Sequence, residues 1–296
     1  APMPPVISFA ISPKSKNDED KIHEALRKIL QEDTGLILRR EEETRQTILS
    51  GRGLVHIEVT AEKIQRKFNV AMEINTPKVP YRETFKKKIR VQGKHKKQSG
   101  GHGQFGDCWI VLEPLPRGTG FEFVDKIVGG VIPKNYIPAV EAGIRESSQH
   151  GILAGFPCVD FRTTLDFGSY HSVDSSEMAF KTAGSIAFKA AAKDAKPVLL
   201  EPVMKVSVKV PDANTGDIMG DLNSRRGRVL GMDSEDDKQI INALVPMSEM
   251  LRYAPDLSSM TGGRGTFTTE FAQYDEVPSD LAQKVIDQVN AQKENN

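Results

Sequence analysis

The sequence predicts an α+β fold of three domains, in which two ferredoxin-like βαββαβ units flank a central module of a different kind. Three observations support this prediction. The same order of strand and helix patterns occurs near both ends of the chain, the middle has its own pattern, and proline-bearing segments at 76–80 and 196–202 separate the parts. The predicted domains are residues 1–76, 77–202 and 203–296, and 296 residues suffice for a core in each.

The composition is that of a globular protein, with 38% hydrophobic and 27% charged residues. The formal net charge is zero, so any attraction to nucleic acid must come from local basic patches. No apolar run approaches the ~18 residues that span a bilayer, and the start does not resemble a signal peptide. We therefore expect a cytoplasmic protein with no membrane partner. The opening APMPPV lacks an initiator Met and indicates a piece of something longer.

The first unit is predicted from the spacing of its apolar residues. Four of them recur at helical spacing after Asn17 or Asp18, either of which can cap a helix. Val55, Ile57 and Val59 alternate, which predicts a strand. The expected elements are strands at 6–11, 36–39, 48–59 and 70–74, and helices at 17–31 and 60–67.

The last unit repeats this order, although its sequence is not obviously similar. Gly227 is placed to end a helix in the left-handed conformation, and Pro255 weakens the helix in which it lies. The expected elements are strands at 205–210, 228–232, 240–245 and 266–274, and helices at 215–226, 248–260 and 281–291.

The central module combines a basic hairpin with further strands and two helices. Gly129 and Gly130 predict a turn within a strand pair, and Asp174 with Glu177 forms a capping-box-like pair at a helix start. The expected elements after the lysine-rich arm are strands at 107–112, 121–131 and 158–167, and helices at 135–150 and 174–193.

The hairpin itself is the main candidate site. Its first arm is basic, and its tip has almost no side-chain bulk, which suits a close approach of the main chain to phosphate and ribose. The alternative is a solvated hairpin whose lysines keep an edge strand soluble, and the residues alone do not decide between the two. The basic arm contains Lys86, Lys87, Lys88, Arg90, Lys94, Lys96 and Lys97, and the tip contains Gln98, Ser99, Gly100, Gly101 and His102.

Other motifs argue against several kinds of enzyme. Gly101, Gly103 and Gly106 spell GxGxxG, but a strand pattern follows where a dinucleotide site needs a helix. No GxxxxGK[ST] motif occurs, so the chain has no obvious means of holding a nucleoside triphosphate. The six histidines show no HExxH spacing, and Cys108 and Cys158 form no CxxC. We expect two buried thiols, no catalytic residue, and no metal or cofactor in this chain.

Two smaller groups remain as candidates. His171 lies in a polar turn ahead of a helix start, where it can bind a phosphate or stack on a base; the alternative is a surface histidine without a role. Arg225, Arg226 and Arg228 form a second basic cluster, and the alternative for them is stabilisation of a helix end.

Several longer motifs together carry a resemblance. They are QSGGHGQFG at 98–106, SYHSVDSSE at 169–177, SRRGRV at 224–229, VPMSEML at 245–251 and GGRGTFTTEF at 262–271. In this order and over essentially the whole chain, they resemble the third, fourth and fifth domains of translational elongation factor G. At two positions the chain departs from that family. His102 stands where the family often has arginine, and Pro255 stands where it commonly has a helix-compatible residue.

The resemblance implies a fold and a function. The fourth domain is expected to be similar to the second domain of ribosomal protein S5, with a left-handed βαβ crossover. The family is a ribosomal translocase, whose fourth-domain tip enters the decoding region and contacts the tRNA–mRNA duplex. The residues expected at that tip are Gln98, Ser99, Gly100, Gly101, His102 and His171, and the basic residues expected to face ribosomal RNA are Lys94, Lys96, Lys97, Arg225, Arg226 and Arg228.

The resemblance also implies where a cofactor binds. GTP and Mg²⁺ are expected in N-terminal domains that this chain lacks, so the intact parent is expected to be a GTPase that binds the ribosome as a monomer. An alternative is a ribosome-protection or ribosome-recycling factor of the same architecture. A dinucleotide enzyme that uses the GxGxxG motif is the competing hypothesis from another class.

Overall fold

The computed structural model describes residues 7–295, which form two compact units. Each unit combines segments that are far apart in the sequence. One contains residues up to 80 together with 202–273, and the other contains 81–201 together with the C-terminal segment from 274. By its contacts, the segment from residue 274 therefore belongs to the same unit as the central module. The predicted domain 203–296 placed this segment with the last module instead.

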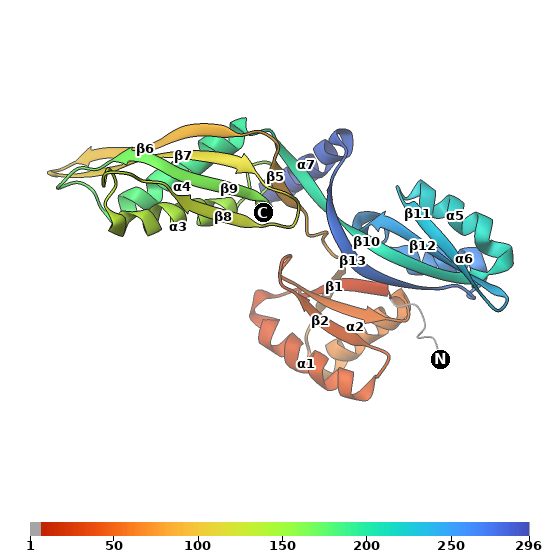
Figure 1. Cartoon of the computed structure of the whole chain (residues 1–296). Coiled ribbons are helices and arrows are strands. Elements are labelled where there is room, and N and C mark those ends of the chain that lie inside the picture. The colour runs from red at the N-terminus through yellow and green to blue at the C-terminus, as the bar shows by residue number, and fades with distance from the viewer. Residues whose placement is uncertain (1–6, 296) are drawn as a thin grey trace. The chain divides into compact units, whose positions relative to one another are not determined.

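The first module is a four-stranded antiparallel sheet with two helices (Figure 1). Its strand order, β2-β3-β1-β4, together with the βαββαβ sequence of elements, is the predicted ferredoxin-like arrangement. Its elements are β1 (Ile7–Pro13), α1 (Glu19–Glu32), β2 (Ile37–Glu41), β3 (Gln46–Gly51), α2 (Leu54–Phe68) and β4 (Met72–Asn75). Val6, which we expected to begin the first strand, lies outside the described residues.

The strand predicted over Val55, Ile57 and Val59 is wrong, because these residues belong to α2. The buried positions of that helix are Ile57, Thr60 and Ile64, which recur at helical spacing, while Val55 is 71% exposed. Three β-branched residues at alternate positions imitate a strand over so short a window. The packing of Ile57 against the sheet decides for the helix.

The last module repeats the ferredoxin-like topology with the sheet order β11-β12-β10-β13. Two details differ from the prediction. Arg226 (φ 58°), and not Gly227, takes the left-handed conformation after α5. Pro255 lies in the first turn of α6, where a proline is tolerated. The elements are β10 (Pro197–Pro211), α5 (Thr215–Ser224), β11 (Arg228–Glu235), β12 (Lys238–Pro246), α6 (Tyr253–Thr261) and β13 (Thr266–Glu276).

The segment 196–202, predicted as a linker, is largely part of a strand. β10 begins at Pro197 and runs without a break to Pro211. Its first residues pair with β5 (Arg82–Phe85) of the central module, and residues from Val203 onward pair with β12. The predicted boundary at 202/203 therefore falls inside a continuous strand.

The central module contains a second kind of sheet, with the order β6-β7-β9-β8. β8 and β9 are parallel and are connected through α3, whereas the other pairs are antiparallel. The left-handedness of this crossover stays a prediction from the resemblance. The elements are β6 (Ile89–Ser99), β7 (His102–Pro114), β8 (Phe121–Asp125), α3 (Ile137–Ser148), β9 (Phe161–Ser169), α4 (Glu177–Asp194) and, from the C-terminal segment, α7 (Ser279–Glu294).

Two local predictions for this module are wrong. The segment 121–131 holds one strand, β8, and not a strand pair, because Gly129 and Gly130 adopt positive φ in a turn from which no second strand returns. The N-cap of α4 is Ser176, whose Oγ accepts a hydrogen bond from the Ala179 N–H, and not Asp174.

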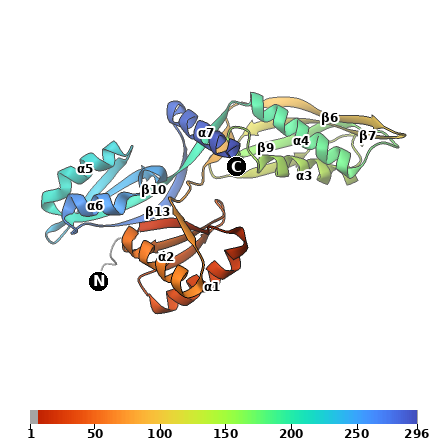
Figure 2. The same cartoon turned by 180° about the vertical axis from the view of Figure 1, so that it is seen from behind.

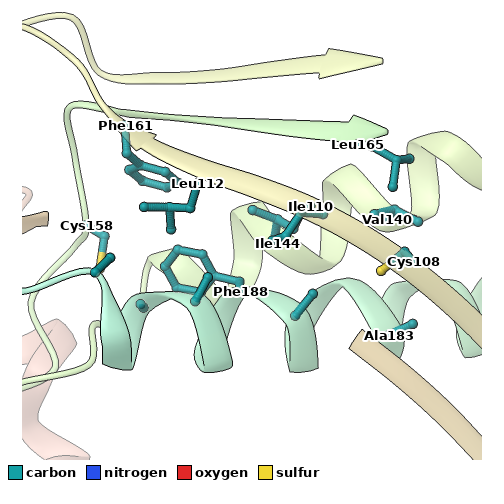
Figure 3. Packing of buried hydrophobic residues seen from close by; sticks show 14 of the residues in the cluster. Cys108, Ile110, Leu112, Val140, Ile144, Cys158, Phe161, Leu165, Ala183 and Phe188 are labelled. Carbon is teal, nitrogen blue, oxygen red and sulfur yellow. The ribbon is translucent and has the colours of Figure 1, made fainter. Parts of the chain in front are cut away.

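α3 and α4 cover one face of the β6-β7-β9-β8 sheet (Figure 2). Apolar side chains from β7, β9 and both helices meet between the layers (Figure 3), and Cys108, Ile110 and Phe161 are completely buried there. Gly93 and Gly106 allow α4 to lie directly on the strands, since a Cβ at either position would clash with the α4 backbone. The opposite face of this sheet is not covered by either helix (Figure 1).

Candidate nucleic-acid interface

The basic hairpin predicted from the sequence is formed by β6 and β7. Their pairing runs from Ile89↔Leu112 to Ser99↔His102, so only Gly100 and Gly101 remain in the turn. Both adopt positive φ, 59° and 101°, which is the geometry of a tight two-residue hairpin turn. A Cβ at either position would meet open space. The tip is therefore an exposed turn of main chain, flanked by the exposed residues Gln98, Ser99 and His102.

The loop that carries His171 lies at the same end of the module. β9 pairs with β7 up to Ser169↔Asp107, and the chain then continues beside β7, where the Phe105 N–H donates to the Asp174 carbonyl. The rings of Phe105 and His171 are 6.5 Å apart between centroids. At about 3.3 Å per strand residue, the hairpin turn at Gly101, four residues from Phe105, extends about 13 Å beyond this contact. The two predicted tip loops thus share one end, in a staggered arrangement.

His171 is held in one orientation by its own loop. Its Nδ1 accepts the backbone N–H groups of Val173 (3.2 Å) and Asp174 (3.1 Å), which places the ring proton on Nε2. Ser175 Oγ accepts the His171 N–H and donates to the Phe105 carbonyl, both at 2.9 Å, so the loop is tied to β7. The side chain is 53% exposed. An outward N–H donor on a fixed imidazole suits a phosphate or ribose oxygen.

Positive charge along β6 is concentrated near the tip. Lys86 pairs with Glu276, Lys88 with Glu113 and Arg90 with Asp166, so the base of the arm is largely neutralised. Lys94, Lys96 and Lys97, in contrast, are exposed and form no ion pair within residues 7–295. Strand alternation places Lys94 and Lys96 on the open face of the sheet, whereas Lys97 lies on the face that α4 covers further along.

The arginines of the last module are not equivalent. Arg225 pairs with Asp221 (2.8 Å) and Asp256 (2.6 Å) and is only 15% exposed, which favours the structural alternative for this residue. Arg226 contacts Glu249. Arg228, at the start of β11, is exposed and is the member of the cluster best placed for a partner.

The structure also bears on the enzyme motifs. The GxGxxG residues lie in the hairpin turn and in β7, so they do not form a dinucleotide site. Within residues 7–295 no group of three or more His, Cys, Asp or Glu side chains is arranged to hold a metal ion. Cys108 and Cys158 are free and buried, as predicted. No helix in the described part of the chain is long and apolar enough to cross a bilayer.

Sequence reasoning missed the residues that join the two loops. Phe105 and Ser175 bring His171 to the hairpin through one ring contact and two hydrogen bonds. Their signal was present only in part: Ser175 sits inside the conspicuous motif SYHSVDSSE, but nothing local in the sequence pairs it with β7.

Two ferredoxin-like modules and a sheet module define a multidomain α+β protein, and the sheet module presents main chain and lysines at the tip of its basic hairpin. Comparison with family models is specific. Residues 3–76 match elongation factor G domain III, residues 77–196 match its domain IV, and residues 198–285 match its C-terminus. The chain belongs to the elongation factor G family, and the matched domains are those of a translation elongation factor.

A solved structure supports the same assignment. The chain is similar to a protein from Thermus thermophilus known from its crystal structure, with a TM-score of 0.85 and 46% sequence identity. The match covers 98% of this chain and 44% of that one, so the present chain spans less than half the length of its relative.

Proposed function

We propose that this chain is the ribosome-binding part of a translational GTPase that promotes the movement of tRNA and mRNA during elongation. The observation that carries the proposal is the shared end of the two tip loops, where a bare glycine turn is exposed and the His171 ring, held by its loop, presents its Nε2–H. Backbone and ribose contacts of this kind are independent of base sequence, which a protein that must act on every codon needs.

The partners follow from the same geometry. The hairpin tip would enter the decoding region and contact the tRNA–mRNA duplex, with Lys94, Lys96 and Lys97 attracting phosphate. Arg228 would face ribosomal RNA. The protein would act in the cytoplasm as a monomer.

GTP and Mg²⁺ belong to other domains of the intact protein in this proposal. The residues present do not fit these groups, because the 296 residues contain no GxxxxGK[ST] motif and residues 7–295 contain no metal-binding cluster. No step of the chemistry is therefore assigned to this chain. Its part is to bind, to position and to block return of the tRNA.

The test is single-turnover translocation with the full-length protein carrying His171→Ala. We expect tRNA movement to slow by at least about tenfold, with GTP turnover unchanged. The loss of one hydrogen bond from the His171 ring to the RNA, worth about 1.4 kcal/mol, corresponds to this factor. His23→Ala, an exposed histidine on α1, is the matched control. Normal tRNA movement combined with loss of ribosome splitting or of drug release would replace translocation by a recycling or protection role.

A further inference from the structure

The uncovered face of the β6-β7-β9-β8 sheet carries large aromatic side chains. Phe167 of β9 is 48% exposed and stands opposite Trp109 of β7 in the strand register. Cys108, next to Trp109, points into the core beneath α3 and α4 (Figure 3), and a Cβ on Gly168, next to Phe167, would meet the core residue Ile132. Trp109 and Phe167 therefore point the other way. Phe167 follows a bulge in the β7–β9 pairing and lies beyond the part of β9 that pairs with β8, and packing inside the module does not explain a half-exposed phenylalanine there.

Basic side chains contact or adjoin the aromatic rings on this face. The Arg90 guanidinium lies 4.5 Å from the centre of the Trp109 ring, and Lys94 Nζ lies 5.7 Å from the centre of the Phe105 ring. Lys96, two residues further along β6, is exposed on this face. Rings and cations therefore alternate from the middle of the sheet toward the hairpin tip.

Two acids of this region are already engaged. Asp107 is buried and accepts hydrogen bonds from Gln92 (2.7 Å) and Ser169 (2.6 Å). Asp166 holds Arg90 through two hydrogen bonds, at 3.0 and 3.1 Å. The Asp174 carboxylate lies at the edge of the face, 3.7 Å from His171 Nδ1. Lys94 and Lys96, which are exposed on the face itself, leave it with positive charge to meet a partner.

A partner that fits must offer both negative charge and flat apolar rings. An unpaired nucleic-acid strand offers phosphates at the spacing of its backbone and a base with two open faces. A duplex hides its bases, and an acidic peptide or lipid surface supplies charge without rings. Four-stranded sheets with exposed aromatics are a recurrent platform for single-stranded RNA.

We infer that the open face of β6, β7 and β9 is a second RNA-binding surface, in which Phe167 stacks on an unpaired base while Lys94 and Lys96 hold phosphates. This surface lies beside the hairpin tip and differs from it in chemistry, because the turn of the hairpin, Gly100 and Gly101, offers only main chain. The inference deepens the proposed function and rests on it for the source of the RNA, a ribosomal or messenger strand.

The experiment is a titration of the 296-residue chain with an unstructured, fluorescently labelled RNA of 12 nucleotides. Trp109 is the sole tryptophan of the chain, so its fluorescence reports on this face, and anisotropy of the RNA gives an independent affinity. We expect saturable quenching. Phe167→Ala should weaken binding about 5- to 150-fold, the loss that corresponds to one base–aromatic stack. Val128→Ala, at an 80% exposed residue outside these strands, should bind like the unchanged protein.

Three results would overturn the inference: unchanged affinity of Phe167→Ala, equal binding of a blunt RNA duplex, or a concentration-dependent dimer that Phe167→Ala abolishes. If the alanine variant does not fold, Phe167→Leu keeps an apolar side chain and removes the ring, and the same weakening is expected. Ribosome translocation by His171→Ala is scored separately. Normal translocation with intact Phe167-dependent RNA binding would contradict only the proposed function.

Discussion

The backbone N–H of Asp174 donates to Nδ1 of His171 across 3.1 Å, and this bond decides which ring nitrogen faces outward. A histidine that receives main-chain donors at Nδ1 presents Nε2–H as a donor. The loop therefore supplies an oriented hydrogen-bond donor beside a hairpin whose own tip consists of main chain.

We predict that His171 is found as the Nε2–H tautomer when neutral. Long-range ¹H–¹⁵N NMR of the imidazole measures this directly, because protonated and unprotonated ring nitrogens differ widely in ¹⁵N shift. Ser175→Ala should mix the tautomers, since it removes the Oγ that ties the loop to Phe105. A dominant Nδ1–H form in the unchanged protein would refute this orientation of the ring.

Charge near the tip should control the salt dependence of ribosome binding. Binding is measured as the slope of log affinity against log salt concentration, to which each neutralised phosphate contributes about 0.7–0.9. Changing Lys94, Lys96 and Lys97 together to Gln should make this slope shallower by about 2. Co-sedimentation at several salt concentrations gives this slope. Lys189→Gln, an exposed lysine on α4, should leave it nearly unchanged. An unaltered slope in the triple variant would remove these lysines from the interface.

Gly93→Ala should destabilise the central module by about 1–3 kcal/mol. A Cβ at Gly93 would lie 2.6 Å from the backbone nitrogen of Ala187, so α4 must move away from β6. Thermal unfolding followed by Trp109 fluorescence measures the loss. Gly220→Ala on α5, where a Cβ meets open space, should leave the Trp109 transition in place. Equal transitions for both variants would contradict the close approach of α4.

Glu83 should be the most sensitive polar residue of the central module. Its carboxylate is completely buried and accepts four backbone N–H groups, from Ile152 (2.7 Å), Leu153 (2.6 Å), Ala154 (3.1 Å) and Phe156 (2.9 Å). Glu83→Gln replaces one accepting oxygen by an NH₂ group, which would face backbone N–H groups that also donate. This change should lower the free energy of unfolding by about 2–4 kcal/mol.

The control for that change is Glu113→Gln, at a half-buried residue that pairs with Arg162. We expect it to cost less than about 1 kcal/mol. Urea unfolding followed by Trp109 fluorescence compares the two variants, and equal costs would show that the 150–157 loop does not depend on the buried carboxylate.

The two thiols should be unreactive in the folded protein. Burial, reinforced by the Asp107 carboxylate, raises the pKa of the Cys108 thiol from 9.0 to about 12, and burial together with Glu83 likewise raises the pKa of Cys158. At pH 8 a disulfide reagent should therefore modify both thiols only after unfolding.

The same shifts set a direction for stability against pH. Above about pH 9 the unfolded chain releases thiol protons that the folded chain retains, so the free energy of unfolding should fall as pH rises from 9 toward 12. Urea unfolding at pH 8 and pH 10 checks this. Replacing both cysteines by alanine should remove that part of the pH dependence.

The periodicity of the sequence was sufficient to predict both ferredoxin-like units. Their strands alternate and their helices repeat at 3.6 residues, and both patterns follow from local backbone geometry. Periodicity was insufficient where a segment was short or where its residues fitted two patterns equally well. Val55, Ile57 and Val59 satisfy the strand pattern, and only the burial of Ile57 against its sheet makes them helical. The sequence likewise did not decide between Asp174 and Ser176 as the N-cap of α4, because both residue types suit that position, and the structure has Ser176.

By itself the sequence determined the α+β class, the bare basic hairpin, the buried thiols and the lack of a nucleotide-binding loop, because each depends on residue type and near neighbours. Tertiary structure alone decided that His171 lies beside Phe105, that Arg225 is taken up by Asp221 and Asp256, and that Trp109 and Phe167 share an uncovered face. The first and last of these facts depend on the pairing of β7 with β9, in which Trp109 and its partner Phe167 are more than 50 positions apart, and such register is set by packing in three dimensions. The contact of Arg225 with Asp256 depends on the packing of α5 against α6.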